Sequence, residues 1–386
     1  IGRNAIAGWD RWPEAWVIPA EQPNEPGVRE LLRVLVTGDV EVQRTGRSFS
    51  VGSREFPAGS WVIRMHQPYA AFAQTLLERQ DYPDLRQYPG GPPRQPYDVT
   101  AHTLPLLLGV EAVPVERLPP AGALELAAPL SEPLPTIREA EGLAGPGAPR
   151  VALYDSFDAN MDEGWTRWIF DQYGVEYERV DNADIRGGGL ADRFDVVVFA
   201  SESPRTIVQG RRAGTVPDSL AGGLGTDGIA ELRRFVEAGG TAVMLEEASL
   251  FGIDAFELPL RNATEGLADE AFFIPGSLLE LTVDIAHPLA AGMPAITAAW
   301  FGEESMAFEQ TEADGRLDVV GRYGAGDPLL SGWALGIEHV AGRPALVEAD
   351  IGRGHVLLFG FRPQYRAQSV ATFPLLFGGL RLGAGG

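Results

Sequence analysis

Two neighbouring glutamates and a nearby serine have residue types and a spacing that could support acid–base chemistry. Glu246 and Glu247 directly follow an apolar run at 241–245, and Ser249 lies two positions further on. Paired carboxylates can serve as general acid and general base, and a serine hydroxyl can act as a nucleophile once a base activates it. No histidine lies close in sequence to activate Ser249. Catalysis by these residues therefore competes with two simpler interpretations, capping of a helix and surface charge.

A second group of oxygen ligands resembles the opening of a calcium-binding loop. Asp158, Asn160 and Asp162 alternate along the chain, as ligands do in such loops. Glu163 stands where the loop requires glycine, and Ile169 stands where it requires a bidentate glutamate. We therefore expect Asp162 and Glu163 to lie in the first turn of a helix, where carboxylates interact favourably with the exposed amides. An adventitious calcium ion on this acidic loop is the alternative.

The five histidines do not form a metallopeptidase pattern. Such a site needs imidazoles and a carboxylate at fixed spacing, as in H-x-x-E or H-E-x-x-H. None of the five has a glutamate three residues later, and no two lie within ten residues of each other. They are His66, His102, His287, His339 and His355. The spacing predicts isolated structural or surface histidines, with no metal site and no cofactor in this chain.

Two residue types are missing from the chain, and their absence excludes several kinds of chemistry. The 386 residues include no cysteine, and all 31 basic residues are arginine. Without cysteine there is no disulfide, no thiolate metal site and no thiol nucleophile. Without lysine there is no Schiff base and no Walker-type phosphate loop. With 53 acidic residues the net charge is −22, which disfavours nucleic acid and anionic membranes as partners.

The elements that must position these residues alternate between strands and helices in the second part of the chain. Strands are predicted at 150–154, 175–180, 194–200 and 241–245, and helices at 164–173 and 228–238, the latter capped by Thr226 or Asp227. The order strand, helix, strand is typical of an open, doubly wound sheet, and 241–245 would deliver Glu246 and Glu247 to its carboxyl edge. A hairpin around IGRG, with strands at 345–349 and 355–361, and a helix at 369–382 follow.

The first part of the chain reads as a smaller mixed α/β domain. We expect a strand at 16–20, helices at 27–36 and 69–80, and a hairpin within 49–62. Trp9, Trp12 and Trp16 could form an exposed platform for carbohydrate, or could be buried by packing.

A stretch rich in proline, alanine and glycine separates the two parts. It lacks the aromatic and β-branched residues of a core, so we predict domains at 1–113 and 150–386 joined by a linker at 114–149. Residues 1–150 hold 14 Arg and 18 acids, a net of −4, whereas 151–386 hold 17 Arg and 35 acids, a net of −18. The acidity therefore belongs to the second domain.

Several long strings resemble the carboxyl-terminal region of secreted bacterial zinc carboxypeptidases of the carboxypeptidase A type. They are MDEGWTRWIFDQYGVEYERVDNADIR, RRFVEAGGTAVMLEEAS, HPLAAGMP, GRGHVLLFGFRPQYRAQSVATFPLLFGGL, QPYAAFAQTLLERQDYPD and PYDVTAHTLPLLLGV. In that family zinc is held in an amino-terminal peptidase domain by an H-x-x-E pair and a distant third histidine. This sequence contains no H-x-x-E, so no zinc ligand or catalytic residue transfers to it.

The second domain also resembles the class I glutamine amidotransferase-like fold, a flavodoxin-type three-layer sandwich. Active members of that class carry a cysteine on the sharp turn after a central strand, with histidine and acid partners. The corresponding turn here is Glu246, Glu247 and Ala248. A carboxylate cannot form the glutamyl thioester intermediate, which argues against amidotransferase chemistry.

The resemblance to zinc carboxypeptidases implies a non-catalytic accessory region of a secreted or periplasmic protein. The resemblance implies an upstream peptidase domain of the same polypeptide as its partner. The chain begins at Ile1 and reads as a mature or excised fragment. Zinc is expected only in that absent domain, and a homo-oligomer stays open. The alternatives are a degenerate enzyme and a module that binds a small molecule or carbohydrate. In the degenerate enzyme Glu247 replaces the cysteine, with Glu246, Arg362 or a histidine brought close by folding as neighbours.

Overall fold

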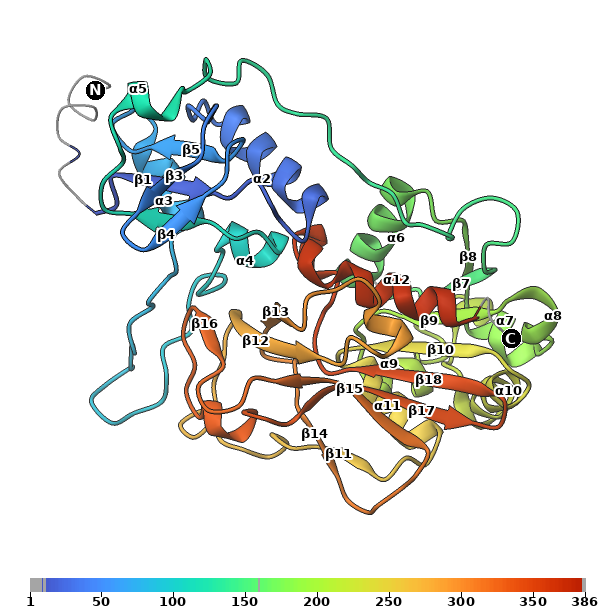
Figure 1. Cartoon of the computed structure of the whole chain (residues 1–386). Helices are drawn as coiled ribbons and strands as arrows, with labels where there is room; N and C mark the ends of the chain where they lie inside the picture. The colour runs from blue at the N-terminus through green and yellow to red at the C-terminus, as the bar shows by residue number, and fades with distance from the viewer. Residues whose placement is uncertain (1–8, 10–11, 159, 384–386) are drawn as a thin grey trace. The chain divides into compact units, whose positions relative to one another are not determined.

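The computed structural model describes residue 9 and residues 12–158 and 160–383 (Figure 1). The chain forms two compact units. Residues 1–80 and 102–138 make up unit 1, and residues 81–101 and 139–386 make up unit 2. No helix in the described part of the chain is long and apolar enough to cross a bilayer.

Unit 1 is a mixed α/β domain, as predicted. Its antiparallel sheet has the order β2 (Gln43–Arg44), β5 (Trp61–Arg64), β1 (Ala15–Ile18) and β6 (Val113–Val115), and a separate hairpin joins β3 (Phe49–Val51) to β4 (Arg54–Phe56). Its helices are α2 (Glu25–Thr37), α3 (Ala70–Leu77), α4 (Leu104–Leu108) and α5 (Ala121–Leu124). Helix α2 begins where the Asn24 side chain accepts a hydrogen bond from the Gly27 amide. The hairpin that was predicted within 49–62 ends at Phe56. The next strand, β5, pairs with β1 and β2 and does not belong to this hairpin.

The division into units differs from the predicted boundaries. The boundary between the two units falls inside the predicted linker, between residues 138 and 139 of the sequence. Val115 lies in β6, which pairs with β1, and Leu143 is 1% exposed in the core of unit 2. A few apolar residues are enough to anchor a proline-rich segment, and overall composition does not reveal them. Residues 81–101, which we call the strap, belong to unit 2, although the sequence analysis placed them in the first domain.

Unit 2 contains a ten-stranded mixed sheet. Its order is β13 (Ile296–Phe301), β12 (Ser277–Val283), β15 (Leu317–Tyr323), β17 (Pro344–Ile351), β18 (Gly354–Phe359), β10 (Thr241–Leu245), β9 (Val196–Phe199), β7 (Val151–Tyr154) and β8 (Tyr177–Val180), with β16 (Leu329–Ser331) beside β12. The five strands from β18 to β8 are parallel, in the flavodoxin-like order 2-1-3-4-5. The others pair antiparallel, and β11 (Leu260–Asn262) and β14 (Phe308–Gln310) form a separate pair.

Helices cover both faces of this sheet, which makes unit 2 a three-layer sandwich. Alternate residues of β10 face opposite cores: Val243 and Leu245 lie in one, and Ala242 and Met244 lie in the other. The first core also holds residues of α6 (Met161–Tyr173) and α12 (Phe373–Leu382). The second holds residues of α7 (Asn182–Gly187), α8 (Leu190–Arg193), α9 (Pro204–Gln209), α10 (Gly225–Glu237) and α11 (Ala248–Ala255). The predicted fold class is thus confirmed.

Helix ends account for most local differences from the sequence analysis. Helix α10 starts at Gly225 and has Leu224 at its N-cap without a side-chain hydrogen bond, so Thr226 and Asp227 lie inside its first turn. The closing helix starts at Phe373, after a 3₁₀ turn. The short 3₁₀ turns are Asp218–Leu220, Pro288–Ala290, Ile337–His339, Tyr365–Ala367 and Val370–Thr372.

Candidate functional site

The turn between β10 and α11 has the geometry of a nucleophile elbow. In such an elbow a strand runs into a helix through one residue with a strained backbone, which projects above the edge of the sheet. Glu246 occupies that position and has a φ of 49°, in the left-handed region that side-chain-bearing residues rarely adopt. Glu246 therefore occupies the strained position of the turn, where the alternative of a degenerate enzyme had placed Glu247.

The Glu246 carboxylate is fully buried and has a donor on each oxygen. Oε1 accepts a hydrogen bond of 2.6 Å from the Ser305 hydroxyl, and Oε2 accepts one of 2.8 Å from the Ser201 hydroxyl. Oε2 also accepts a hydrogen bond from Nε of Arg362. Ser201 follows β9, Ser305 follows β13 and Arg362 follows β18, so one carboxylate ties together three loops.

The surroundings of Glu246 raise the pKa of its carboxyl group. Burial raises the pKa of Glu246 to about 7, and Arg362 and the two serine hydroxyls lower it only in part. Nε of Arg362 also lies 3.2 Å from Oδ2 of Asp162, and its Nη2 lies 3.2 Å from Oε2 of Glu304. The guanidinium stands 5.5 Å from the ring centre of Trp300. Arg362 is thus the central cation of a group of three carboxylates.

Glu202 is a second carboxyl group with a perturbed pKa at the same edge. It follows β9, and its Oε1 accepts a hydrogen bond of 2.5 Å from the Ser156 hydroxyl. Burial, together with nearby acids including Asp158, raises the pKa of Glu202 to about 7, although the hydrogen bond from Ser156 lowers it in part. The sequence analysis missed Glu202, although it directly follows the predicted strand at 194–200, where the carboxyl-edge argument applied to Glu246 and Glu247 would have found it.

Glu247 faces a cavity of about 350 Å³ beside the elbow. Its side chain is half-buried, and burial raises its pKa, with Glu304 raising it further. Asp269, Glu303 and Glu304 also line this cavity, together with Phe272. The cavity is therefore an acidic hollow suited to a small cationic ligand.

Ser249 is placed where its hydroxyl serves the packing of α11. The side chain is fully buried and donates to the carbonyls of Met244, at 3.1 Å, and Phe359, at 2.9 Å. Both acceptors belong to central strands of the sheet. The hydroxyl thus joins the helix to the sheet and has no contact with Glu246 or Glu247 among the described interactions.

The three residues of the calcium-like loop have separate partners. Asp158 pairs with Arg211, and Asp162 pairs with Arg362. Asn160 is the N-cap of α6, where its Oδ1 accepts hydrogen bonds from the amides of Asp162 and Glu163. The expected placement of Asp162 and Glu163 in the first helical turn is thus confirmed, and each side chain of the proposed ligand set is engaged elsewhere.

The three tryptophans of unit 1 differ in exposure and do not form a common platform. Trp16 is 4% exposed and its indole N–H donates to Gln74. Trp12 is 61% exposed, and Trp9 is partly buried with its indole N–H on the Pro13 carbonyl. This argues against a carbohydrate platform made of all three rings, because Trp16 packs in the core.

Comparisons with known proteins concern the fold. No protein-family model and no curated protein matches this sequence. Among solved structures, a cytoplasmic protein from Salmonella typhimurium aligns at 13% identity with a TM-score of 0.40, covering 60% of this chain and 98% of that one. A GMP synthase-type protein from Thermoplasma acidophilum aligns at 11% identity and 0.37, covering 60% and 94%. A ThuA-like protein from Bacteroides uniformis aligns at 11% and 0.36, covering 59% and 89%.

The topology of unit 2 defines its fold class from its own strands. The parallel order 2-1-3-4-5, the helices on both faces and the strained turn after β10 are all present. Unit 2 therefore has a flavodoxin-like three-layer α/β fold, with Glu246 at the strained turn after β10.

Proposed function

We propose that the chain is a non-catalytic accessory region of a larger protein that resembles a secreted zinc carboxypeptidase. The observation that carries this proposal is the state of Glu246. Its carboxylate is inaccessible, and both oxygens are occupied by Ser201, Ser305 and Arg362. A nucleophile must reach a substrate atom, and a group held in this way cannot do so without breaking a buried network.

In this proposal the elbow serves as a structural clamp. The strained backbone at Glu246 costs free energy, which the buried network offsets. The clamp holds the loops after β9, β13 and β18 at fixed positions along the edge of the sheet. Unit 2 would then present a rigid, acidic surface to an upstream peptidase domain of the same polypeptide, in a secreted or periplasmic protein.

The experiment compares the 386-residue chain with the longer polypeptide that the proposal expects. Both are incubated with Zn²⁺ and with peptides that carry a free carboxyl terminus, and the released amino acid is measured. The longer polypeptide should release it and the 386-residue chain should not. The chain should also release no ammonia from glutamine. Turnover of either substrate by the 386-residue chain contradicts the proposal.

A second candidate function is the binding of a small cation in the hollow beside Glu247. The observation that favours it is the lining, in which Glu247, Asp269, Glu303 and Glu304 surround a cavity of about 350 Å³. Agmatine, which carries a guanidinium and an amine, is a suitable probe for calorimetry. Binding that disappears in Glu247→Gln supports this function, and absence of saturable binding to the unaltered chain removes it.

A further inference from the structure

The hairpin of β17 and β18 places one imidazole and two carboxylates on one face of the sheet, at the end of the strands opposite to Glu246. Glu348 and Asp350 lie two residues apart on β17, so their side chains share a face of the strand. The tight turn through Gly352 sets Asp350 directly opposite His355 at the start of β18, and opposed residues of an antiparallel pair also share a face. The register alone therefore collects the three side chains.

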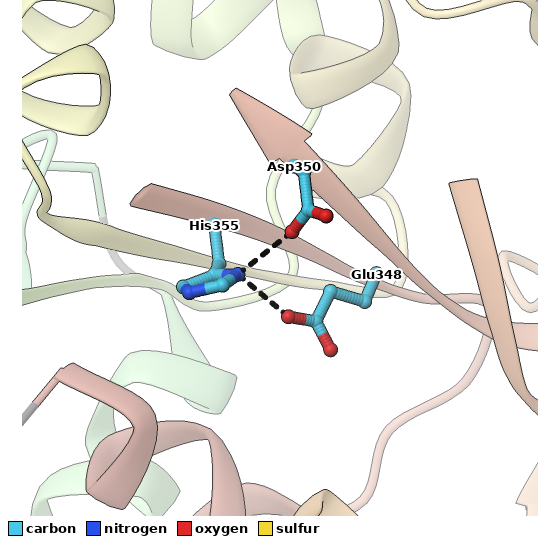
Figure 2. Close-up of side chains that lie close together, drawn as sticks. All are labelled: Glu348, Asp350 and His355. Atoms are coloured by element: carbon cyan, nitrogen blue, oxygen red, sulfur yellow. Dashed lines mark hydrogen bonds and ion pairs between the residues drawn. The ribbon is translucent and has the colours of Figure 1, made fainter. Parts of the chain in front are cut away.

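The potential ligand atoms converge closely. Nδ1 of His355 lies 2.6 Å from Oε1 of Glu348 and 3.1 Å from Oδ1 of Asp350 (Figure 2). Each of the three residues contributes one potential ligand atom, and these three atoms lie within 4.8 Å of one another. Ligands about 2.1 Å from a zinc ion are themselves separated by roughly 2.8 to 3.6 Å. Side-chain movements of up to about an ångström would thus turn this arrangement into a coordination sphere.

Glu348 is buried without a full set of hydrogen bonds. It is 6% exposed, and its Oε2 receives no hydrogen bond, although Nε2 of His287 lies only 2.8 Å away. This separation is that of an ion pair with His287, but Oε2 has no hydrogen bond of good geometry. A buried carboxylate oxygen in this state is costly. A cation at the carboxylate would compensate it.

His287 is held so that it faces this carboxylate. Its Nδ1 accepts a hydrogen bond of 3.3 Å from the Leu289 amide, which leaves Nε2 directed toward Glu348 and toward Asp318, 3.9 Å away. A second histidine that fixes the orientation of a ligand is a common feature of metal sites. Three carboxylates gather around two imidazoles here, and this excess of acidic groups favours a divalent ion.

We propose that Glu348, Asp350 and His355 bind one divalent transition-metal ion of the Zn²⁺ type, with His287 as a positioning residue for Glu348. The imidazole ligand favours Zn²⁺ over Ca²⁺ and Mg²⁺, which prefer oxygen ligands. Three protein ligands leave a coordination position for water, and His355 borders a cavity of about 470 Å³ through which water and the ion can enter. This ion is separate from the zinc of any peptidase domain, so the proposal does not depend on the proposed function.

The main test is calorimetric titration of the metal-stripped 386-residue chain with Zn²⁺. We expect one saturable site, with affinity at least about 10-fold weaker in His355→Ala and in Asp350→Asn. Asp350 is well exposed, so its variant should fold even if the other does not. The matched control is His102→Ala, which removes an exposed histidine of unit 1 and should leave the affinity unchanged. Equal affinity in the unaltered chain and in both site variants overturns the proposal.

The role of His287 requires a spectroscopic measurement. Co²⁺ bound in place of Zn²⁺ reports on its ligands through visible d–d absorption. His355→Ala should change the spectrum, because a ligand nitrogen is lost. His287→Ala should weaken binding by about 10-fold or more but keep the spectrum at saturation. If both variants change the spectrum equally, His287 is a ligand and its assignment as a positioning residue is wrong.

Discussion

Glu246 and Glu348 are two buried glutamates at opposite edges of one sheet, and their surroundings differ. Both oxygens of Glu246 accept hydrogen bonds, and a guanidinium compensates the charge. Glu348 has an oxygen without a hydrogen bond and two histidines close by. A fully satisfied carboxylate contributes to the structure, whereas an incompletely satisfied one is suited to a ligand. The buried carboxylate at the strained turn after β10 is therefore the less available of the two to a ligand.

One strand connects the two edges. His355 lies at the start of β18, and Arg362 follows its end. At about 3.3 Å per residue the strand from His355 to Phe359 alone spans roughly 13 Å. The sites are thus far enough apart for independent substitution, and the effects on stability should add.

The largest expected effect tests whether Glu246 is structural. Glu246→Ala removes one partner of a buried ion pair and should lower the free energy of unfolding by about 3 to 5 kcal/mol, measured by urea denaturation at neutral pH. Glu247→Ala is the matched control, because the neighbouring side chain is only half-buried, and it should cost less than about 1 kcal/mol. Equal costs for the two variants would remove the distinction between them.

The pH dependence of stability sharpens the same assignment. The pKa of Glu246 in the folded chain is about 7, above its ordinary value of 4.5, so the folded state holds the proton more tightly. Its contribution to stability is therefore full below pH 4.5 and is lost as the pH rises to 7, by at most about 3 kcal/mol. The stability of the unaltered chain minus that of Glu246→Gln should fall over this range. A difference independent of pH contradicts the raised pKa.

Added Zn²⁺ should stabilise the folded chain only through the site formed by Glu348, Asp350 and His355. Zn²⁺ at 100 times its dissociation constant should raise the free energy of unfolding by about 2.7 kcal/mol, because it binds the folded state. The measurement is urea denaturation with and without the ion. The increase should persist in Glu247→Gln and disappear in His355→Ala. Stabilisation that survives the loss of His355 would place the ion elsewhere.

The smallest effect concerns Asp350 without metal. Its side chain is 67% exposed, so Asp350→Asn should change the stability of the metal-stripped chain by less than about 0.5 kcal/mol. The same variant should lose most of the stabilisation by Zn²⁺. A large cost without metal would mean that Asp350 is already a structural residue, like Glu246.

The sandwich could be predicted because buried parallel strands are continuous apolar runs. The runs at 194–200 and 241–245 became β9 and β10, and the position of Glu246 and Glu247 at the carboxyl edge followed. Its burial state could not be predicted, because Ser305 and Arg362 reach Glu246 from loops 59 and 116 residues later.

The group formed by Glu348, Asp350 and His355 was not predicted, for a different reason. The sequence analysis searched for ligands at helical spacing, whereas Glu348, Asp350 and His355 are collected by a hairpin. Acids at i and i+2 around the end of one predicted strand, followed by a histidine at the start of the next, are a usable signal. His287 could not be found in this way, since it comes from a separate loop.

The strap has a consequence for the order of events during synthesis. Its Thr100 hydroxyl donates to the Gly276 carbonyl, 176 residues further along the chain. A ribosome adds about 5 to 20 residues per second, so the strap leaves it roughly 9 to 35 seconds before its partner strand exists. During that time the first unit can be complete, while a segment in the middle of its sequence still waits for the sandwich to which it belongs.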